Sequence, residues 1–229
     1  KFKNIKWIKS LKKLNKSPSI YLANEFFDAL PIKQFSKSKN SWFEKFVHFY
    51  SNKKAKFINK KVDIRKIEKK INYKFSDKQN FLEYSPLGFK YLKDIFKFIK
   101  KNNGGLLIID YGYFDKKMQD TLQAIYRKRY SKVLENIGKS DITYNINYYF
   151  IKKIAENFKG LNINFTSQKE FLTNLGIRQR AEIICKNKTF SETSDIFYRL
   201  KRLIDKKEMG DLFKVMLIKK SNNKSQIGF

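Results

Sequence analysis

The stretch SIYLANEFFDALPI, Ser19–Ile32, decides the fold. Its first half is a short apolar run, and its second half places Asn24, Glu25 and Asp28 among large apolar side chains. A second run of this kind, LLIID at Leu106–Asp110, follows two glycines and ends in Asp-Tyr-Gly. Short apolar runs between turn signals are typical of strands buried on both faces, as in parallel sheets covered by helices. We therefore predict an α/β fold with a mixed, mostly parallel sheet.

The two apolar runs share polar residues at their carboxyl ends, and in open α/β sheets that edge is where ligands bind. The NEFFD residues that follow the first run have two interpretations. In one, Asn24 caps a helix, Glu25 and Asp28 lie in its first turn, and the phenylalanines are core. In the other, the carboxylates line a site. The sequence pattern alone leaves both open.

Helical and strand patterns fill most of the remaining chain. Apolar residues at three- and four-residue steps predict a helix over 89–99, ended by a left-handed cap at Asn103. Ser167 and Glu170 have capping-box spacing, with Gly176 as the stop. A further helix is expected over 193–204 and a closing strand over 212–220.

Two less regular stretches are predicted as insertions. Residues 33–80 contain alternating aromatic runs that predict a hairpin or small sheet. Residues 113–160 predict a helix in MQDTLQAIYRKRY, followed by a partly exposed aromatic segment in SDITYNINYYF. Because no linker composition marks a boundary, we expect residues 1–229 to form a single, partial α/β domain.

The formal net charge of +30 favours a nucleic-acid partner at first sight, because clustered cations neutralise phosphates. The cations are 44 Lys and only 7 Arg, spread along the whole chain. Arg is the usual residue for bidentate base and phosphate contacts, and AT-rich coding can supply the Lys excess. We therefore expect a solvated basic surface, and a nucleic-acid-binding module remains the weaker alternative.

The chain has one Cys and one His. Cys185 alone allows no internal disulfide, and His48 alone excludes paired-His metal sites. His48 lies in FEKFVHFY, whose alternation favours a sheet position over a catalytic one. We expect no metal site, no membrane span and no secretory signal.

Several stretches together resemble the MidA family of S-adenosylmethionine-dependent methyltransferases, whose eukaryotic members are mitochondrial assembly factors for respiratory complex I. They occur in the family's order and cover nearly the whole chain. The matching stretches are ANEFFDALPIKQF (23–35), GGLLIIDYGY (104–113), DTLQA (120–124), DIT (141–143), FLTNLGIRQRAE (171–182) and EMGDLFKVMLI (208–218).

The resemblance implies a Rossmann-like methyltransferase fold, S-adenosyl-L-methionine as cofactor, and methylation of an arginine in a protein substrate, a complex I subunit. It also implies a location in the mitochondrial matrix if the source is eukaryotic, or the cytoplasm if it is bacterial. The family carries its glycine-rich cofactor turn ahead of NEFFD, and this chain has no G-x-G. Since it also begins at Lys1, we expect the C-terminal two-thirds of a family member, inactive alone.

The resemblance implies that the NEFFD residues bind the arginine side chain that is methylated. Carboxylates hold a guanidinium through forked hydrogen bonds, and aromatic rings exclude water. We predict Glu25 and Asp28 as catalytic substrate carboxylates, with Asn24 as a positioning amide. Asn24 and Glu25 are also expected to contact the cofactor. The predicted substrate-binding residues are Phe26, Phe27, Asp110, Tyr111 and Glu83.

Two of these predictions have simpler alternatives. Asp110 could have a structural role alone, as an acceptor for backbone donors of the following loop. Glu83 could be a solvated loop residue. The chain also departs from the family pattern, with Asn145 and Asn147 at positions usually occupied by His and Asp, and Gln119 in place of a glycine. These departures leave a non-catalytic assembly chaperone on a methyltransferase fold as a further alternative.

Overall fold

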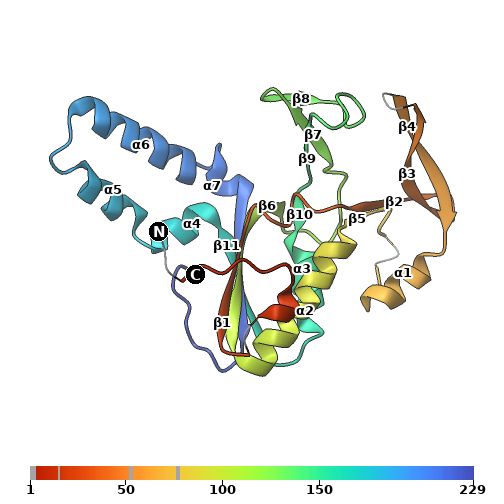
Figure 1. The fold of residues 1–229 in the computed structure, drawn as a ribbon, viewed down its shortest axis with the longest axis horizontal. Coiled ribbons are helices and arrows are strands. Elements are labelled where there is room, and N and C mark those ends of the chain that lie inside the picture. Colours follow the sequence, from red (N-terminus) through yellow and green to blue (C-terminus); the bar gives the residue numbers. More distant parts are fainter. Residues whose placement is uncertain (1–3, 15, 52–53, 76–77) are drawn as a thin grey trace.

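A central sheet organises the molecule in the computed structural model, which describes residues 4–14, 16–51, 54–75 and 78–229 (Figure 1). Its strand order is β1-β6-β12-β11, and β10 also pairs with β6. The sheet strands are β1 (Ser19–Asn24), β6 (Gly104–Tyr113), β10 (Ile146–Asn147), β11 (Leu161–Ser167) and β12 (Phe213–Lys220).

Both apolar runs of the sequence form strands of this sheet, as expected, with β6 inside it and β1 at its edge. β1 and β6 are parallel, with Ala23 opposite Ile108, and β10 is parallel to β6. β12 runs antiparallel to β6, and β11 antiparallel to β12. The predicted α/β class is confirmed, and the sheet is mixed because its parallel core is closed by an antiparallel pair.

Two helices, α2 (Pro86–Asn102) and α3 (Tyr148–Glu156), cover one face of the sheet (Figure 1). α2 starts at Ser85, whose hydroxyl accepts a hydrogen bond from the Gly88 N–H, and it ends at Asn103 with φ 70°. Gly104 follows with φ 110°, and a Cβ there would lie 1.9 Å from the Ser19 carbonyl oxygen. Glycine is therefore required where the chain turns from α2 into β6.

β1 is an edge strand, and its other face is open among the described residues. Ile20 is 84% exposed and Leu22 is 67% exposed, whereas Ala23 on the covered face is buried. An uncovered apolar edge strand is a template for pairing with further chain.

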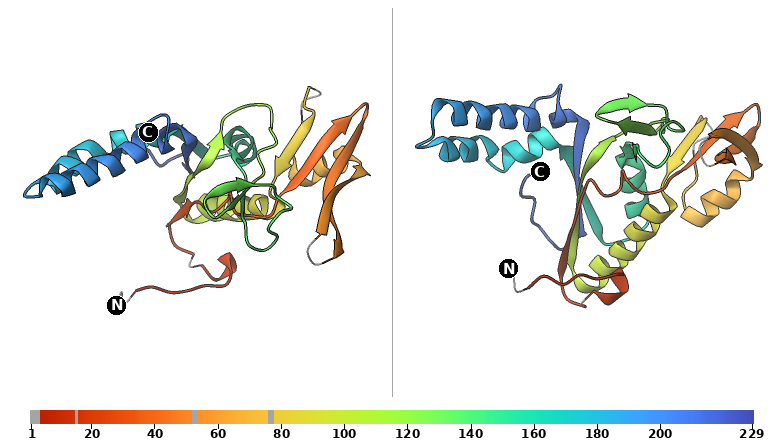
Figure 2. Two further views of the ribbon diagram at one scale, coloured as in Figure 1. Left: turned by 90° about the horizontal axis from the view of Figure 1, so that it is seen from above. Right: turned by 45° about the horizontal axis from the view of Figure 1, so that its top comes forward.

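The first predicted insertion, residues 33–80, is a small antiparallel sheet with strand order β4-β3-β2-β5 (Figures 1 and 2). His48 lies on β3, where its ring contacts Tyr50 at 4.9 Å. The elements are β2 (Lys33–Ser38), β3 (Ser41–Ser51), β4 (Lys54–Val62), α1 (Ile64–Ile71) and β5 (Phe81–Tyr84).

The second predicted insertion, residues 113–160, differs from the prediction in its secondary structure. The helix expected in MQDTLQAIYRKRY is instead a hairpin of β7 (Gln123–Tyr126) and β8 (Arg129–Ser131), with β9 (Asp141–Thr143) on the other side of β7. Arg127 and Lys128 turn the hairpin with φ values of 49° and 63°. A two-residue turn of this kind usually has Asn or Gly, so the sequence carried no turn signal.

The C-terminal part forms a helical arm that extends from the sheet at the end opposite the β2–β5 sheet (Figures 1 and 2). The predicted capping box at Ser167 and the left-handed Gly176 are both present. A short 3-10 helix, Leu11–Lys13, precedes β1. The arm and its base comprise α4 (Gln168–Asn174), α5 (Ile177–Cys185), α6 (Phe190–Ile204) and α7 (Met209–Leu212).

Candidate functional site

The NEFFD turn leaves β1 through a strained backbone. Asn24 is the last residue of β1, and Glu25 follows with φ 45°, in the left-handed region that residues other than glycine seldom adopt. The Glu25 N–H still donates to the Ile109 carbonyl oxygen at 3.0 Å, which continues the β1–β6 ladder by one bond. The Glu25 side chain is exposed. Backbone strain of this kind is typical of functional turns and is kept only where neighbouring contacts fix it.

The contact that fixes the turn is Asp110. Its Oδ2 accepts the backbone N–H groups of Phe26, Phe27 and Asp28, at 3.2, 3.0 and 3.3 Å. Its Oδ1 accepts the Tyr111 N–H at 2.9 Å. Asp110 is fully buried, so its carboxylate anchors the turn and is not open to a ligand. Burial and the nearby Asp28 raise the pKa of Asp110 to about 7 despite these four hydrogen bonds.

Asp28 lies beneath the same turn. It is 4% exposed, and its Oδ1 has no hydrogen-bond partner among the described residues. Burial first, and then the charges of Glu25 and Asp141, raise its pKa. A buried acceptor without a partner is costly, so a donor from a bound molecule would be stabilising there.

Asp141 is a site candidate that the sequence analysis did not assign. It begins β9, and three residues later the Tyr144 N–H donates to the Asp28 carbonyl oxygen at 3.3 Å. The pKa of the Tyr111 phenol is raised by burial and then by four carboxylates, those of Glu25, Asp28, Asp110 and Asp141. A chain of formal net charge +30 therefore has an acidic site at the carboxyl ends of β1 and β6. The only sequence signal for Asp141 was its place in the DIT stretch.

The acids do not form a metal centre. In the part of the chain that the structure describes, no three His, Cys, Asp or Glu side chains are grouped so as to hold a metal ion. The described helices also include none long and apolar enough to cross a bilayer.

Aromatic side chains flank the acids. Phe26 is 41% exposed, and its ring contacts those of Phe27 and Tyr91 at 5.2 and 5.6 Å. Phe27 is buried beneath the turn. Tyr111 packs on Phe213 with ring centroids 4.2 Å apart. Of the predicted substrate-binding aromatics, Phe26 has an exposed face, Tyr111 is half-buried, and Phe27 is core.

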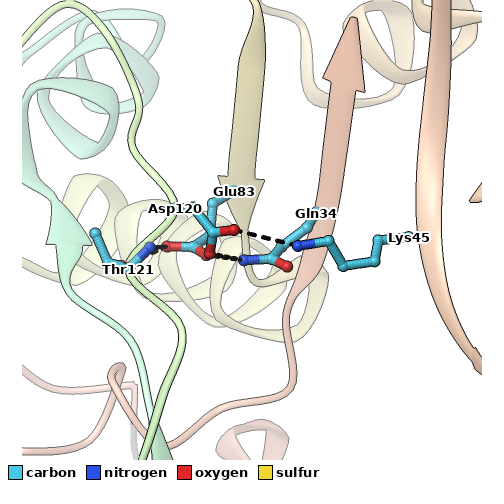
Figure 3. A network of polar contacts seen from close by, with 5 residues as sticks. All are labelled: Gln34, Lys45, Glu83, Asp120 and Thr121. Atoms are coloured by element: carbon cyan, nitrogen blue, oxygen red, sulfur yellow. Dashed lines mark hydrogen bonds and ion pairs between the residues drawn. The ribbon is translucent and has the colours of Figure 1, made fainter. Parts of the chain in front are cut away.

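Glu83 lies in a separate polar network (Figure 3). It is 5% exposed, and burial raises its pKa. Its Oε2 accepts from Gln34 Nε2 at 2.5 Å, and its Oε1 accepts from the Thr121 hydroxyl at 2.5 Å. Asp120 accepts from Gln34 at 2.7 Å and forms an ion pair with Lys45 at 3.2 Å. The network ties β2, β3 and β5 to the DTLQA segment.

Glu83 does reach the neighbourhood of the turn through the core. A cavity of about 30 Å³, space for roughly one water molecule, is lined by Phe27, Glu83 and Tyr144 among others. Glu83 therefore borders the same cavity as Phe27 of the turn. It is buried and hydrogen-bonded, so the solvated loop alternative does not describe it.

Asn147 has a clear structural role. Its Oδ1 caps α3 by accepting the Phe150 N–H at 2.8 Å, and its Nδ2 donates to the Asp115 carbonyl oxygen at 3.0 Å. An Asp would cap the same helix. The departure from the family pattern at this position therefore leaves local structure intact. Asn145 donates its backbone N–H to the Thr121 hydroxyl at 2.8 Å.

Two polar residues at the start of the turn are candidates for contacting a cofactor. Asn24 and Glu25 are exposed at the carboxyl end of an open edge strand, where cofactors of α/β folds bind. No G-x-G turn follows any strand, and none occurs in the sequence.

The mixed α/β sheet, with α2 and α3 on one face and an acidic-aromatic turn at the end of a parallel strand, has the architecture of a Rossmann-like fold. The chain belongs to the family described as "Putative S-adenosyl-L-methionine-dependent methyltransferase", whose model matches residues 1–166.

Curated relatives share low identity over most of this chain. The protein arginine methyltransferase NDUFAF7, mitochondrial, of Danio rerio is 25% identical over 209 residues, 91% of this chain and 49% of the relative. That of Rattus norvegicus is 28% identical over 182 residues, 79% of this chain and 41% of the relative. The chain thus spans about half the length of the curated relatives that it matches.

Two solved structures from Burkholderia thailandensis share the fold. One is an uncharacterised protein with a TM-score of 0.79 and 21% identity, covering 96% of this chain and 60% of its own. The other was solved with S-adenosyl-homocysteine bound, and has a TM-score of 0.76 and 20% identity, covering 98% of this chain and 58% of its own.

Proposed function

We propose that the protein carries the methyl-acceptor site of an S-adenosyl-L-methionine-dependent protein arginine methyltransferase. The observation that supports this best is the Glu25 carboxylate, exposed on a strained turn that also contains the buried Asp28, whose Oδ1 has no hydrogen-bond partner among the described residues. Guanidinium is the cationic, multi-donor group that such a pair of acids binds. The arginine methyltransferases among the relatives support the same substrate class.

The proposed roles follow from burial. Glu25 binds the guanidinium directly because its side chain is exposed, and Phe26 covers the site on the solvent side. Asp28 Oδ1 accepts an N–H of the acceptor nitrogen as it enters, and Asp141 adds negative charge. Asp110 acts through the turn as a positioning residue. Asn24 and Glu25 lie where they would contact the cofactor, which when bound supplies an electrophilic methyl group.

The raised pKa of Asp28 suits a second task. The nitrogen that gains a methyl group must lose a proton, and a carboxylate whose pKa lies above its ordinary value is a better base. We propose that Asp28 takes this proton. Glu25 and the neighbouring aromatic rings then hold the acceptor nitrogen in line with the methyl group, about 3 Å from the methyl carbon.

The substrate and place are also proposed from the resemblance and the relatives. We propose a subunit of respiratory complex I as the protein methylated, with the mitochondrial matrix as the location if the source is eukaryotic and the cytoplasm if it is bacterial. The single domain over residues 1–229 remains our proposal for the organisation of this part.

The test uses a version extended at its N-terminus by a glycine-rich cofactor turn. Calorimetry should detect S-adenosylmethionine binding, and mass spectrometry should detect a methylated arginine in a cognate peptide. Cofactor binding without methylation of any arginine peptide would favour the assembly chaperone instead. Failure of both would contradict the methyltransferase proposal.

A further inference from the structure

A basic groove lies at the base of the helical arm, between α4, α5 and the C-terminal half of α6. Its volume is about 480 Å³. Five cations line it, and Asp205 is the single acid among the lining residues. The cations are Lys169, Arg178, Lys201, Lys206 and Lys207.

Lys169 lies beside Glu170 in the sequence and, after hydrogen bonds to that carboxyl, helps to lower its pKa. Within the described ranges, none of the five forms an ion pair within 4 Å. Asp205 is already used, because its Oδ1 accepts the Lys207 N–H at 2.9 Å and helps close the turn before α7. Elsewhere in the chain, cations such as Lys45 and Lys153 are held by acids or lie over aromatic rings. The groove therefore concentrates positive charge that no ion pair within 4 Å neutralises among the described residues.

The floor of the groove is apolar. Leu200 and Ile204 are buried against Ala181 on α5, and Phe197 one turn earlier on α6 is 45% exposed. An occupant therefore meets both a rim of cations and a hydrocarbon surface. Acidic side chains together with an apolar one complement this surface.

The groove lies at the same end of the sheet strands as the acidic site, although on the other side of the sheet from β1. β11 ends at Ser167, which pairs with Lys214, and Lys214 pairs with Asp110 at the end of β6. Lys169 is in the first turn of α4, directly after β11, and Lys206 and Lys207 directly precede α7 and β12. β11 is three strand spacings from β1, roughly 15 Å, which about five extended residues span.

We propose that this groove docks an acidic segment with apolar side chains on a protein partner. The identification of that partner with the protein that carries the methylated arginine rests on the proposed function. In that case the acidic segment lies about five or more residues from the target arginine. The basic groove and the acidic turn then bind opposite charges of one substrate and fix its direction.

An acidic peptide fits the groove better than a nucleic acid. Single-stranded nucleic acids are bound by successive aromatic rings that stack on bases, and the lining includes one ring, Phe197. Its other apolar residues, Leu200 and Ile204, are aliphatic and suit peptide side chains.

The experiment measures binding of a labelled peptide of alternating Glu and Leu at physiological ionic strength. We expect Lys206→Glu combined with Lys207→Glu to weaken binding by about tenfold or more. The matched control is Lys90→Glu with Lys97→Glu, which makes the same charge change at exposed positions on α2. The control should retain binding within about twofold.

Two further probes distinguish docking from general attraction of anions. A Glu-Ser peptide of equal charge should bind more weakly than the Glu-Leu peptide, and Phe197→Ser should remove that difference. Equal binding of both peptides, equal loss in both charge variants, or tighter binding of single-stranded RNA of equal charge would each overturn the proposal. Because no methyl transfer is measured, failure here is separate from failure of the proposed activity.

Discussion

Asp110 at the end of β6 accepts the backbone N–H of Phe27 from the turn after β1, at 3.0 Å. This contact joins two segments separated by 83 positions in the chain. With the N–H groups of Phe26 and Asp28 on the same oxygen, it holds the turn that presents Glu25. The site geometry therefore depends on a residue that a ligand does not reach.

Asp110→Ala should destabilise the protein by about 3 kcal/mol, because several buried backbone donors lose their charged acceptor together. Urea unfolding measures the change. Asp115→Ala is the matched control, since Asp115 is exposed and its carboxylate accepts only the nearby Lys117 N–H among the described contacts. The control should stay within about 0.5 kcal/mol. Equal effects of the two variants would show that the anchor is unimportant.

The stability of the protein should decrease from about pH 4 to about pH 7. The folded pKa of Asp110 is about 7, well above the unfolded value of about 3.9. The stability linked to this group is therefore full below about pH 4 and is lost as pH rises through about 7. Asp28 and Glu83, whose pKa values are also raised, act in the same direction.

We expect Asp110 alone to contribute about 4 kcal/mol to this decrease, at about 1.4 kcal/mol for each of the roughly three pH units between its unfolded and folded pKa values. Denaturant unfolding at several pH values measures it. Asp110→Asn removes the titrating group and should flatten the profile. An unchanged slope in that variant would rule out Asp110 as the source.

Glu83 and Thr121 should be energetically coupled because the Thr121 hydroxyl donates to Glu83 in the network of Figure 3. Glu83→Gln, Thr121→Val and the double variant form a double-mutant cycle. We expect a coupling free energy of about 1–2 kcal/mol. Glu83→Gln combined with Thr173→Val, at an exposed site on α4, is the additive control. Coupling in the control, or none in the test pair, would disagree with the network.

Asn147→Ala should cost about 1 kcal/mol of stability by removing the N-cap of α3. Asn147→Asp keeps the accepting oxygen and should recover most of this loss. Thermal unfolding compares the variants. A methylation defect in Asn147→Ala larger than its stability loss explains would instead give Asn147 a direct role.

Much of the fold could be predicted from the sequence because local patterns agree with it. The apolar runs that became β1 and β6 are bounded by turn residues. The capping box at Ser167 starts α4, and the left-handed Gly176 follows its end. The β7–β8 hairpin could not be predicted, because Arg127 and Lys128 adopt left-handed backbone without being typical turn residues. Tertiary pairing with β9 overrides local preference there.

The candidate site was predicted only in part, because long-range contacts determine which of its carboxylates are buried. The sequence places Glu25 and Asp28 after a strand, but it does not say which carboxylate is buried or paired. Asp110 satisfies backbone donors of a distant segment, and Asp141 approaches the turn from a separate three-stranded sheet. Both facts arise from contacts across more than eighty positions of the chain, which local pattern does not encode.

The central claim is that the Glu25 carboxylate binds the methyl acceptor. The most direct measurement compares methylation of a cognate arginine peptide and calorimetric cofactor affinity for Glu25→Gln, in the N-terminally extended version. We predict that methylation falls about a hundredfold while cofactor affinity is nearly unchanged. Glu25→Gly should lose methylation equally while unfolding no more easily, since glycine accepts φ 45° without strain. Retained methylation in both variants, or an equal loss of cofactor affinity, would contradict the account.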